Sequence, residues 1–325
     1  MKIGKVPENV LKRSVLRQIQ TKREEIICGA GIGEDCAVFS FDCREMMTCI
    51  QTAAVAAASA VSMGQLIRRC TNNLAAAGAE PVGIMIALTL PPETEEAEIK
   101  ALMAEASACC KELNIQIAGG QTCISSAVRE PVAAVTGYGR PFDREKSRPV
   151  RAGQDIVISK WIGLEGTAIL AGRYRDKLLQ RYPAYFVEEA AGFDRFLSVI
   201  PEAATAVKSG VCMMHDASEG GIFGALWELA ERAGVGLTID LKKLPLRQET
   251  VEVCECCEAN PYELLSGGTL LMVTEDGPGL AEALKAENIP AAVVGRVTDS
   301  NNRMIVNGEE MRFLGRPAGD EIYRV

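Results

Sequence analysis

Hydrophobic residues recur along this chain in two periods, and together they predict a mixture of helices and strands. Apolar positions three and four residues apart predict helices in the first half, over residues 10–19, 63–79 and 93–113. Short apolar runs predict strands between them, over residues 37–41, 46–52, 81–90, 115–118 and 131–137. Because the connections mix hairpins with crossovers, the first half is expected to be α+β.

The second half shows the same mixture. Strands are predicted at residues 155–159, 235–239, 269–273 and 291–297, and helices at 165–170, 184–199, 203–209, 249–257 and 280–287. Between the halves, residues 139–153 carry four arginines, one lysine and two prolines, which is typical of a crossing between domains. We therefore expect two α+β domains, 1–150 and 151–325.

One segment of the second half carries candidate chemistry. The apolar run 211–214 precedes His215, Asp216 and Glu219, and a glycine pair then opens a helix with one apolar face. An acidic turn at the start of a helix is suited to a phosphate that is bound together with a divalent cation, because helix amides point outward there. The alternative is an ordinary capped helix start, for which the same residue types are common.

Composition limits the classes of function. The 325 residues are 48% hydrophobic and carry a formal net charge of −8, which gives no general attraction for nucleic acid or an anionic membrane. No apolar span reaches the ~18 residues that a transmembrane helix needs. The first residues lack the apolar centre of a secretory signal, so a cytoplasmic location is expected.

Twelve cysteines are present, and in such a chain thiols are expected rather than a disulfide framework. Cys254, Cys256 and Cys257 form a cluster. A structural zinc there is not favoured, because four-ligand sites usually show two paired cysteine motifs.

Four polar or glycine-rich clusters lie at predicted strand ends or helix starts. They are Gly31–Asp35, Thr52-Ala53, Thr71–Leu74 and Gly119–Thr122. Together with the segment around Asp216 and the blocks LLSGGTLLM and GDEIYRV, they resemble the aminoimidazole ribonucleotide (AIR) synthetase superfamily over nearly the whole chain. The order of the blocks is most similar to the branch related to AIR synthase that includes the hydrogenase maturation factor HypE.

The resemblance implies a fold and a cofactor. Members have an N-terminal domain whose sheet pairs with that of a second subunit, and an α+β C-terminal domain, so a homodimer is expected. It also implies ATP with Mg²⁺ in the N-terminal domain and ATP-dependent activation of a small substrate. The implied cofactor-binding residues are Gly31, Gly33, Asp35, Thr52, Asn72, Asn73, Gly119, Gly120 and Gln121. The implied metal ligands are Asp35 and Asp216, and Asp216, His215 and Glu219 are the candidate catalytic residues.

The chain also departs from the family pattern. The family usually has aspartate at the positions of Ala53 and Asn73, and aspartate, histidine or glutamate at Gln121. Because Mg²⁺ prefers anionic oxygen ligands, we expect an eroded metal site with weak nucleotide binding or none. The alternative is a non-catalytic dimeric paralogue that acts as a binding or regulatory partner. The carboxy-terminal cysteine of HypE has no counterpart in Glu321–Val325, so its maturation reaction is not expected in the usual form.

Overall fold

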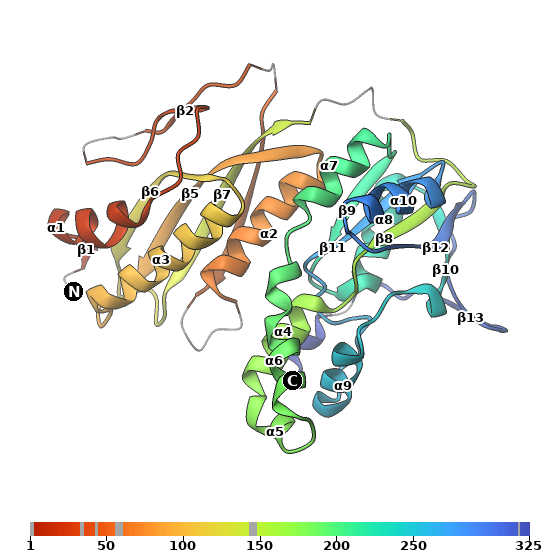
Figure 1. The fold of residues 1–325 in the computed structure, drawn as a ribbon. Coiled ribbons are helices and arrows are strands. Elements are labelled where there is room, and N and C mark those ends of the chain that lie inside the picture. Colours follow the sequence, from red (N-terminus) through yellow and green to blue (C-terminus); the bar gives the residue numbers. More distant parts are fainter. Residues whose placement is uncertain (1–2, 33–35, 43–44, 56–60, 143–147, 318) are drawn as a thin grey trace. The chain divides into compact units, whose positions relative to one another are not determined.

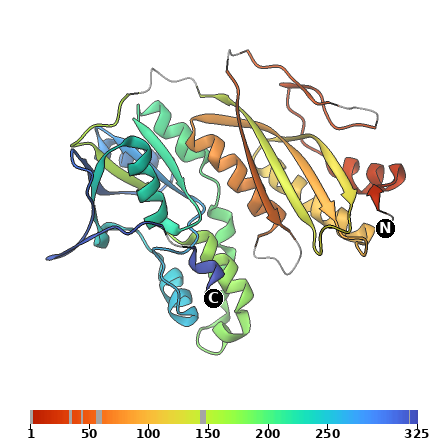
Figure 2. The same cartoon turned by 180° about the vertical axis from the view of Figure 1, so that it is seen from behind.

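The chain folds into two compact units, which Figures 1 and 2 show from opposite sides. The computed structural model describes residues 3–32, 36–42, 45–55, 61–142, 148–317 and 319–325. The N-terminal unit comprises Met1–Leu74 and Ala79–Pro141, and the C-terminal unit comprises Ala75–Gly78 and Phe142–Val325. Each unit combines helices with a sheet, which confirms the expected α+β class. The predicted boundary between domains 1–150 and 151–325 stays a prediction.

The N-terminal unit is built on a five-stranded sheet in the order β1-β6-β5-β7-β4. These strands are β1 (Gly4–Lys5), β4 (Met47–Ala54), β5 (Ala79–Leu90), β6 (Gln116–Ile124) and β7 (Val132–Pro141), and β2 (Ile26–Cys28) pairs with β3 (Val38–Phe39) in a small second sheet. The opening helix is irregular, with α1 (Glu8–Val10), a π turn (Leu11–Val15) and a 3₁₀ turn (Leu16–Gln18), and it is followed by α2 (Met63–Ala76) and α3 (Glu96–Glu112).

Helices α2 and α3 share one hydrophobic core with the sheet. Ile67 of α2, Leu88 of β5 and Met103 of α3 are all buried in one cluster. Helix α3 connects β5 to β6, which run parallel, whereas the other strand pairs are antiparallel. A parallel pair needs such a crossover connection, and the apolar face of α3 covers the sheet that it crosses.

The C-terminal unit has a seven-stranded sheet in the order β14-β13-β10-β12-β8-β11-β9. Its strands are β8 (Asp155–Ser159), β9 (Met213–Ala217), β10 (Gly236–Asp240), β11 (Thr269–Thr274), β12 (Ala291–Thr298), β13 (Arg303–Asn307) and β14 (Glu310–Phe313). Its helices are α4 (Leu164–Arg173), α5 (Arg175–Leu179), α6 (Ala184–Ala191), α7 (Ile200–Lys208), α8 (Gly221–Ala233), α9 (Gln248–Cys257) and α10 (Gly277–Ala286).

Both faces of this second sheet are covered. Ile156 and Ile158 of β8 pack in the cluster that contains α8, whereas Val157 packs in the cluster that contains α7 and α10. Successive strand residues point to opposite faces, so a central strand between two helical layers is buried on both of its faces. This explains why β8 and β11 are buried at every position.

Two features differ from the sequence expectations. Strands β1, β2, β13 and β14 are absent from the sequence prediction. The predicted turn at His215 and Asp216 is wrong, because both residues lie within β9.

Within the described residues, no helix has the length and apolar character to span a bilayer. The expected cytoplasmic location stays a prediction.

Candidate functional site

A candidate site of the N-terminal unit is a cavity of about 620 Å³ at the edge of β6. Strand β1 pairs with β6 only at Cys123 and Ile124, so the earlier part of this edge has no neighbouring strand in the described chain. The cavity lies between this edge, the opening helix and the described residues 29–32 and 36–37. It brings together four predicted cofactor-binding residues, Gly31, Gly119, Gly120 and Gln121.

Gly120 is required by the backbone at this edge. Its φ is +148°, a conformation that side chains rarely adopt, and a Cβ there would lie 1.9 Å from the carbonyl oxygen of Ile86. Gly119, by contrast, has room for a methyl group, whose nearest neighbour would be the Cε of Met85 at 3.4 Å. Gly120 therefore lets β6 approach β5 closely and keeps the adjoining edge open to the cavity.

The walls of the cavity are mostly apolar, and their residues are not among the predicted site residues. The opening helix contributes Leu11, Val15 and Leu16, and the sheet contributes Met85 and Ile117. The helical spacing of the first three predicts an apolar helix face, and that signal does not distinguish a core face from a cavity wall. The cavity can hold an apolar group with polar contacts at its glycine-rich edge.

Thr52 lies level with Gln121 on the same sheet face. The register pairs Thr52 with Ala134, Ala134 with Ala87, and Ala87 with Gln121. This cross-strand row spans three strand spacings, or about 14 Å. Thr52 and Gln121 are exposed, but Thr52 is not part of the cavity lining. The two residues therefore share a face without meeting in one cavity.

The neighbouring row points to the opposite face. Ala53 pairs with Ala133, which pairs with Leu88, and Ala53 packs against the cluster that includes Ala133 and Leu88. Asn72 and Asn73 lie on α2, which covers this same face, and Asn72 is only 2% exposed. Predicted site residues are thus divided between two faces of the sheet. Gly33 and Asp35 lie outside the described residues, so the metal-binding role of Asp35 stays a prediction.

His215 and Asp216 point to opposite faces of β9, because successive residues of a strand alternate. His215 lies on the α8 side, where its Nε2 is 2.9 Å from the Oε2 of Glu228. Asp216 lies on the side of Met214, which packs with α7 and α10, and it is 9% exposed. Burial raises the pKa of the Asp216 carboxyl, although the nearby His215 opposes this shift. The two side chains therefore do not converge on one substrate position from this strand.

The start of α8, predicted as an anion site, is occupied by the chain's own groups. The Gly220 amide donates to the Oδ2 of Asp320 at 2.7 Å. The Gly221 amide donates to the carbonyl of Ser218, and the Phe223 amide to that of Tyr262. A carboxylate at a helix N-terminus is stabilised by the helix dipole. Asp320 therefore fills the position that a bound anion would take.

Glu219 is held by the same C-terminal segment. The Tyr323 hydroxyl donates to its Oε1 at 2.6 Å. Glu219 is exposed, whereas Asp216 is buried in the strand before it. The catalytic roles predicted for Asp216, His215 and Glu219, and the metal-binding role predicted for Asp216, stay predictions.

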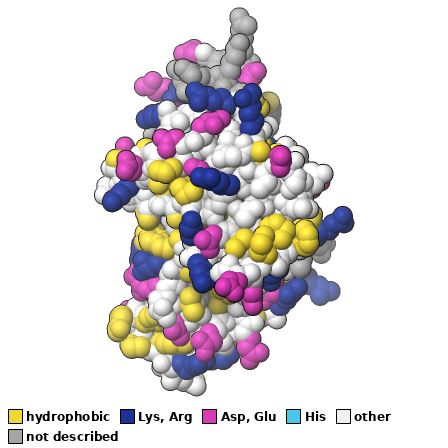
Figure 3. All heavy atoms as spheres, turned by 90° about the vertical axis from the view of Figure 1, so that its right-hand side faces the viewer, with side chains coloured by type: hydrophobic (Ala, Val, Ile, Leu, Met, Phe, Trp, Pro, Cys, Tyr) yellow, Lys and Arg dark blue, Asp and Glu magenta, His cyan; other side chains and the backbone are white. Residues whose placement is uncertain are grey.

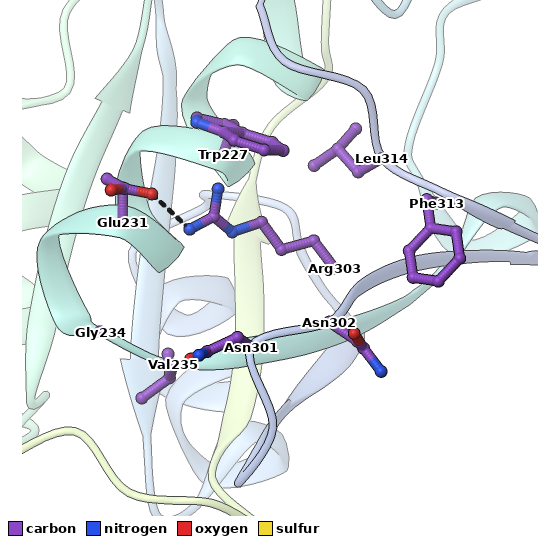
Figure 4. A pocket seen from close by; sticks show the side chains of 9 residues that line it. All are labelled: Trp227, Glu231, Gly234, Val235, Asn301, Asn302, Arg303, Phe313 and Leu314. Carbon is purple, nitrogen blue, oxygen red and sulfur yellow. Dashed lines mark hydrogen bonds and ion pairs between the residues drawn. The ribbon is translucent and has the colours of Figure 1, made fainter.

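A second cavity, of about 460 Å³, lies in the C-terminal unit between α8 and the strands β13 and β14. Figure 4 shows the Arg303 guanidinium beneath the Trp227 ring and next to Glu231. The guanidinium carbon is 3.8 Å from the Trp227 ring centroid, and Nη2 is 2.5 Å from the Oε2 of Glu231. Because the cationic group already has both a π face and a carboxylate, this cavity offers little free charge for a ligand.

The described residues contain no group of three or more His, Cys, Asp or Glu side chains that could hold a metal ion. Cys254, Cys256 and Cys257 are buried on α9, and burial raises the pKa of Cys254 to about 12. They therefore behave as small apolar side chains. On the face drawn in Figure 3, basic and acidic side chains are interspersed rather than gathered into a region of one sign.

Comparison with known families gives the chain's identity. Residues 33–140 match the N-terminal domain of the AIR synthase related proteins, and residues 151–307 match the C-terminal domain of the same family. The chain is an AIR synthase related protein. This confirms the resemblance drawn from the sequence, because two successive domains of one family match in the expected order.

The relatives of this AIR synthase related protein include hydrogenase maturation proteins. It is 24% identical to a hydrogenase expression/formation protein of Methanocaldococcus jannaschii, over 99% of this chain and 97% of that protein. It is also 29% identical to the carbamoyl dehydratase HypE of Rhodobacter capsulatus, over 69% of this chain and 66% of that protein. The AIR synthase related protein is therefore HypE-like.

A solved structure supports the same fold. The hydrogenase maturation protein HypE, crystallised in complex with ATP, superposes on this AIR synthase related protein with a TM-score of 0.78. The match covers 97% of this chain and 95% of that chain at 17% sequence identity. The two-domain AIR synthase fold is therefore confirmed.

Proposed function

We propose that this HypE-like protein binds a nucleotide at the β6 edge cavity but holds a magnesium-bound triphosphate weakly. The ATP complex of a HypE with the same fold supports nucleotide binding, and the nominal activity that we propose is the ATP-dependent activation of a small substrate. One observation carries the proposal. Gly31, Gly119, Gly120 and Gln121 line one cavity whose walls are mostly apolar.

The described donors fit a nucleotide better than they fit a magnesium ion. The row from Thr52 to Gln121 offers a hydroxyl and a carboxamide but no carboxylate. Glu8 is the one acidic residue among the described residues that line the cavity, and it is exposed and paired with Lys12. Mg²⁺ is bound in proteins by one or two carboxylates together with phosphates and water. The described residues therefore do not fit the metal, and no reaction step is assigned to it.

The expected weakening of magnesium-bound nucleotide binding can be calculated from the missing carboxylate contacts. Each charge-assisted contact contributes about 1.5–3 kcal/mol. The described residues that line the cavity offer no carboxylate except that of the exposed, paired Glu8, and two missing carboxylate contacts correspond to roughly two to four powers of ten in affinity for magnesium-bound nucleotide. Binding weaker by this factor than at a site with two such carboxylates is therefore expected, with little dependence on Mg²⁺.

Calorimetric titration of the full chain with ATP, with Mg²⁺ and then with EDTA, tests the proposal. We expect weak binding that changes less than tenfold when Mg²⁺ is removed. Tight binding that is lost without Mg²⁺ would show an intact metal site. The variant Gln121→Glu, at a residue that lines the cavity, is expected to gain affinity for ATP in Mg²⁺. Asn301→Asp makes the same amide-to-carboxylate change in the other unit and is expected to change nothing.

The variant Ala53→Asp would be less informative than Gln121→Glu. Ala53 packs against the hydrophobic cluster below the sheet, so a carboxylate there would be partly buried without a cation. Such burial costs stability and would obscure any gain in binding. For this reason the test introduces a carboxylate at Gln121, whose side chain is exposed.

A second candidate function is a non-catalytic dimeric paralogue that acts as a binding or regulatory partner. The observation that favours it is the outer face of β4, an edge strand on which Ile50 is 62% exposed. An exposed apolar edge strand is a surface that proteins usually cover. Light scattering of the wild type and of Ile50→Lys would test a homodimer formed through this strand. A dimer that is unchanged in Ile50→Lys would count against pairing through β4.

A further inference from the structure

Two cysteine thiols are in direct contact in the N-terminal unit, outside the candidate cavity. The Sγ of Cys49 on β4 lies 3.5 Å from the Sγ of Cys70 on α2. The Sγ of Cys49 is also 3.1 Å from the carbonyl oxygen of Cys70. The contact joins an edge strand of the sheet to the helix that covers it.

The packing around the pair leaves space for this contact. Gly137 of β7 lies directly across from Cys49 in the strand register. A Cβ at Gly137 would lie 2.8 Å from the Sγ of Cys70, closer than such atoms approach one another. The glycine therefore leaves the volume in which the Cys70 sulfur faces Cys49.

The two thiols differ in their access to solvent. Cys70 has no exposed surface, whereas Cys49 is half-buried. The hydrogen bond with Cys49 and burial raise the pKa of the Cys70 thiol, so Cys70 stays protonated at neutral pH. A small oxidant arriving from solvent therefore meets Cys49 first.

We propose that Cys49 and Cys70 form an oxidisable dithiol that closes to an intramolecular disulfide when a peroxide reaches Cys49. Cys49 attacks the peroxide oxygen, and its sulfur is oxidised to a sulfenic acid while the peroxide is reduced and leaves as water. The Cys70 sulfur then attacks the Cys49 sulfur, and the S–S bond forms as the S–O bond breaks. The second water carries away the hydroxyl group and the Cys70 proton, so two thiols and one peroxide give one disulfide and two waters.

The movement that this reaction requires is small. An S–S bond is about 2.05 Å long, so the sulfurs must approach by about 1.5 Å from their observed 3.5 Å contact. Rotation about the side-chain bonds of the two cysteines can supply part of this distance, and a small backbone shift can supply the rest.

The bond would connect two segments that the family pattern assigns to cofactor binding. Strand β4 carries Thr52, and α2 carries Asn72 and Asn73. Oxidation would fasten these segments to each other, which gives the proposed nucleotide site a dependence on thiol state. This consequence rests on the proposed function, whereas formation of the disulfide does not.

Peptide mapping tests the disulfide directly. The folded full chain is treated with hydrogen peroxide, alkylated with N-ethylmaleimide, digested without reductant and analysed by mass spectrometry. We expect a cross-linked peptide pair that contains Cys49 and Cys70, with two fewer alkylated cysteines and reversal by dithiothreitol. Two results would overturn the proposal. In one, Cys49 is found as the sulfinic acid while Cys70 is still alkylated, and in the other, Cys49 is joined to a cysteine other than Cys70.

Three variants keep the test decisive. In Cys70→Ala, Cys49 is expected to stop at the sulfenic acid, which dimedone traps. If that variant does not fold, Cys49→Ser at the half-buried position is expected to abolish the cross-link instead. Cys123→Ser is the matched control, because Cys123 is also half-buried on a strand, where it contacts Thr89. A cross-link that persists in Cys49→Ser, or is lost in Cys123→Ser, contradicts the assignment. ATP titration of reduced protein separates failure of the nucleotide proposal from failure of this one.

Discussion

The carboxylate of Asp320 accepts a hydrogen bond from the amide of Gly220, 100 residues earlier in the chain, at the first turn of α8. Its other oxygen accepts from the amides of Leu265, at 3.1 Å, and Ile322, at 2.8 Å. One buried side chain thus satisfies three separate backbone segments of the C-terminal unit. Local sequence around the helix gives no sign of this partner.

Replacing Asp320 is expected to destabilise the C-terminal unit. In Asp320→Ala, three amides lose a charged acceptor, and the free energy of unfolding is expected to fall by about 2–4 kcal/mol. Asp320→Asn keeps one acceptor oxygen and is expected to lose less. Urea unfolding followed by circular dichroism measures both. Equal losses in the two variants would mean that the side chain's volume, rather than its acceptors, stabilises the unit.

Two adjacent glycines of β6 are expected to respond differently to alanine. Gly120→Ala places a Cβ against the Ile86 carbonyl at a positive φ, so a loss of about 3 kcal/mol or more is expected. Gly119→Ala meets only the mobile end of Met85, so its loss is expected to stay near 1 kcal/mol or below. Thermal unfolding of the two variants provides the comparison. A stable Gly120→Ala protein would contradict the close approach of β6 to β5.

The Arg23–Glu25 ion pair is expected to make the free energy of unfolding depend on pH. Arg23 lies 2.7 Å from the Glu25 carboxylate and lowers its pKa to about 2. Because the folded pKa lies below the unfolded value, the stabilisation is present above pH 4.5 and is lost as the pH falls through 2.

Glu25→Gln is therefore expected to be less stable than the wild type by about 1–3 kcal/mol at pH 7 and equally stable near pH 2. Urea unfolding over this pH range measures the difference. Glu24→Gln, at the exposed neighbouring position, serves as the control. A difference between Glu25→Gln and the wild type that stays constant with pH would exclude the carboxylate charge as its cause.

Because Lys160 and Glu202 form a buried ion pair, the effects of replacing them on the free energy of unfolding are expected to be strongly coupled. Lys160 Nζ lies 2.5 Å from Glu202 and donates to the carbonyls of Phe196 and Ser198, while burial lowers the pKa of Lys160. Lys160→Met leaves a buried carboxylate without its cation, so a loss of about 3–5 kcal/mol is expected. Adding Glu202→Leu is expected to recover much of this loss in a double-mutant cycle. Strictly additive losses would show that the charges do not interact.

The elements that could be predicted from the sequence are those with uniform burial. The prediction for strand β8 matches its observed bounds, because all five of its residues are apolar or buried between two helical layers. Strands β13 and β14 escape prediction, because they carry polar or charged residues such as Arg303, Glu310 and Arg312, and β14 is exposed throughout. The edge strand β14 lacks the burial pattern on which such a prediction depends, and β13 beside it has only one fully buried residue.

The candidate site could be predicted only in part, because its residues come together through register rather than spacing. The glycine clusters at Gly31 and Gly119 are recognisable locally, and they line one cavity. Thr52 and Ala53 point to opposite faces in any register, and the register across β7 decides which of them faces the helices. A shift of one residue would exchange the faces, and sequence does not specify such a shift where both residues are small.

The contact between Gly220 and Asp320 has a consequence for how the chain is made. Protein synthesis proceeds from the amino terminus, and N-terminal parts usually fold first. Helix α8 leaves the ribosome without the carboxylate that completes its first turn, and the missing group follows only after another hundred residues have been added. The C-terminal unit is therefore expected to reach its final stability late in translation, whereas every strand and helix of the N-terminal unit has by then been synthesised.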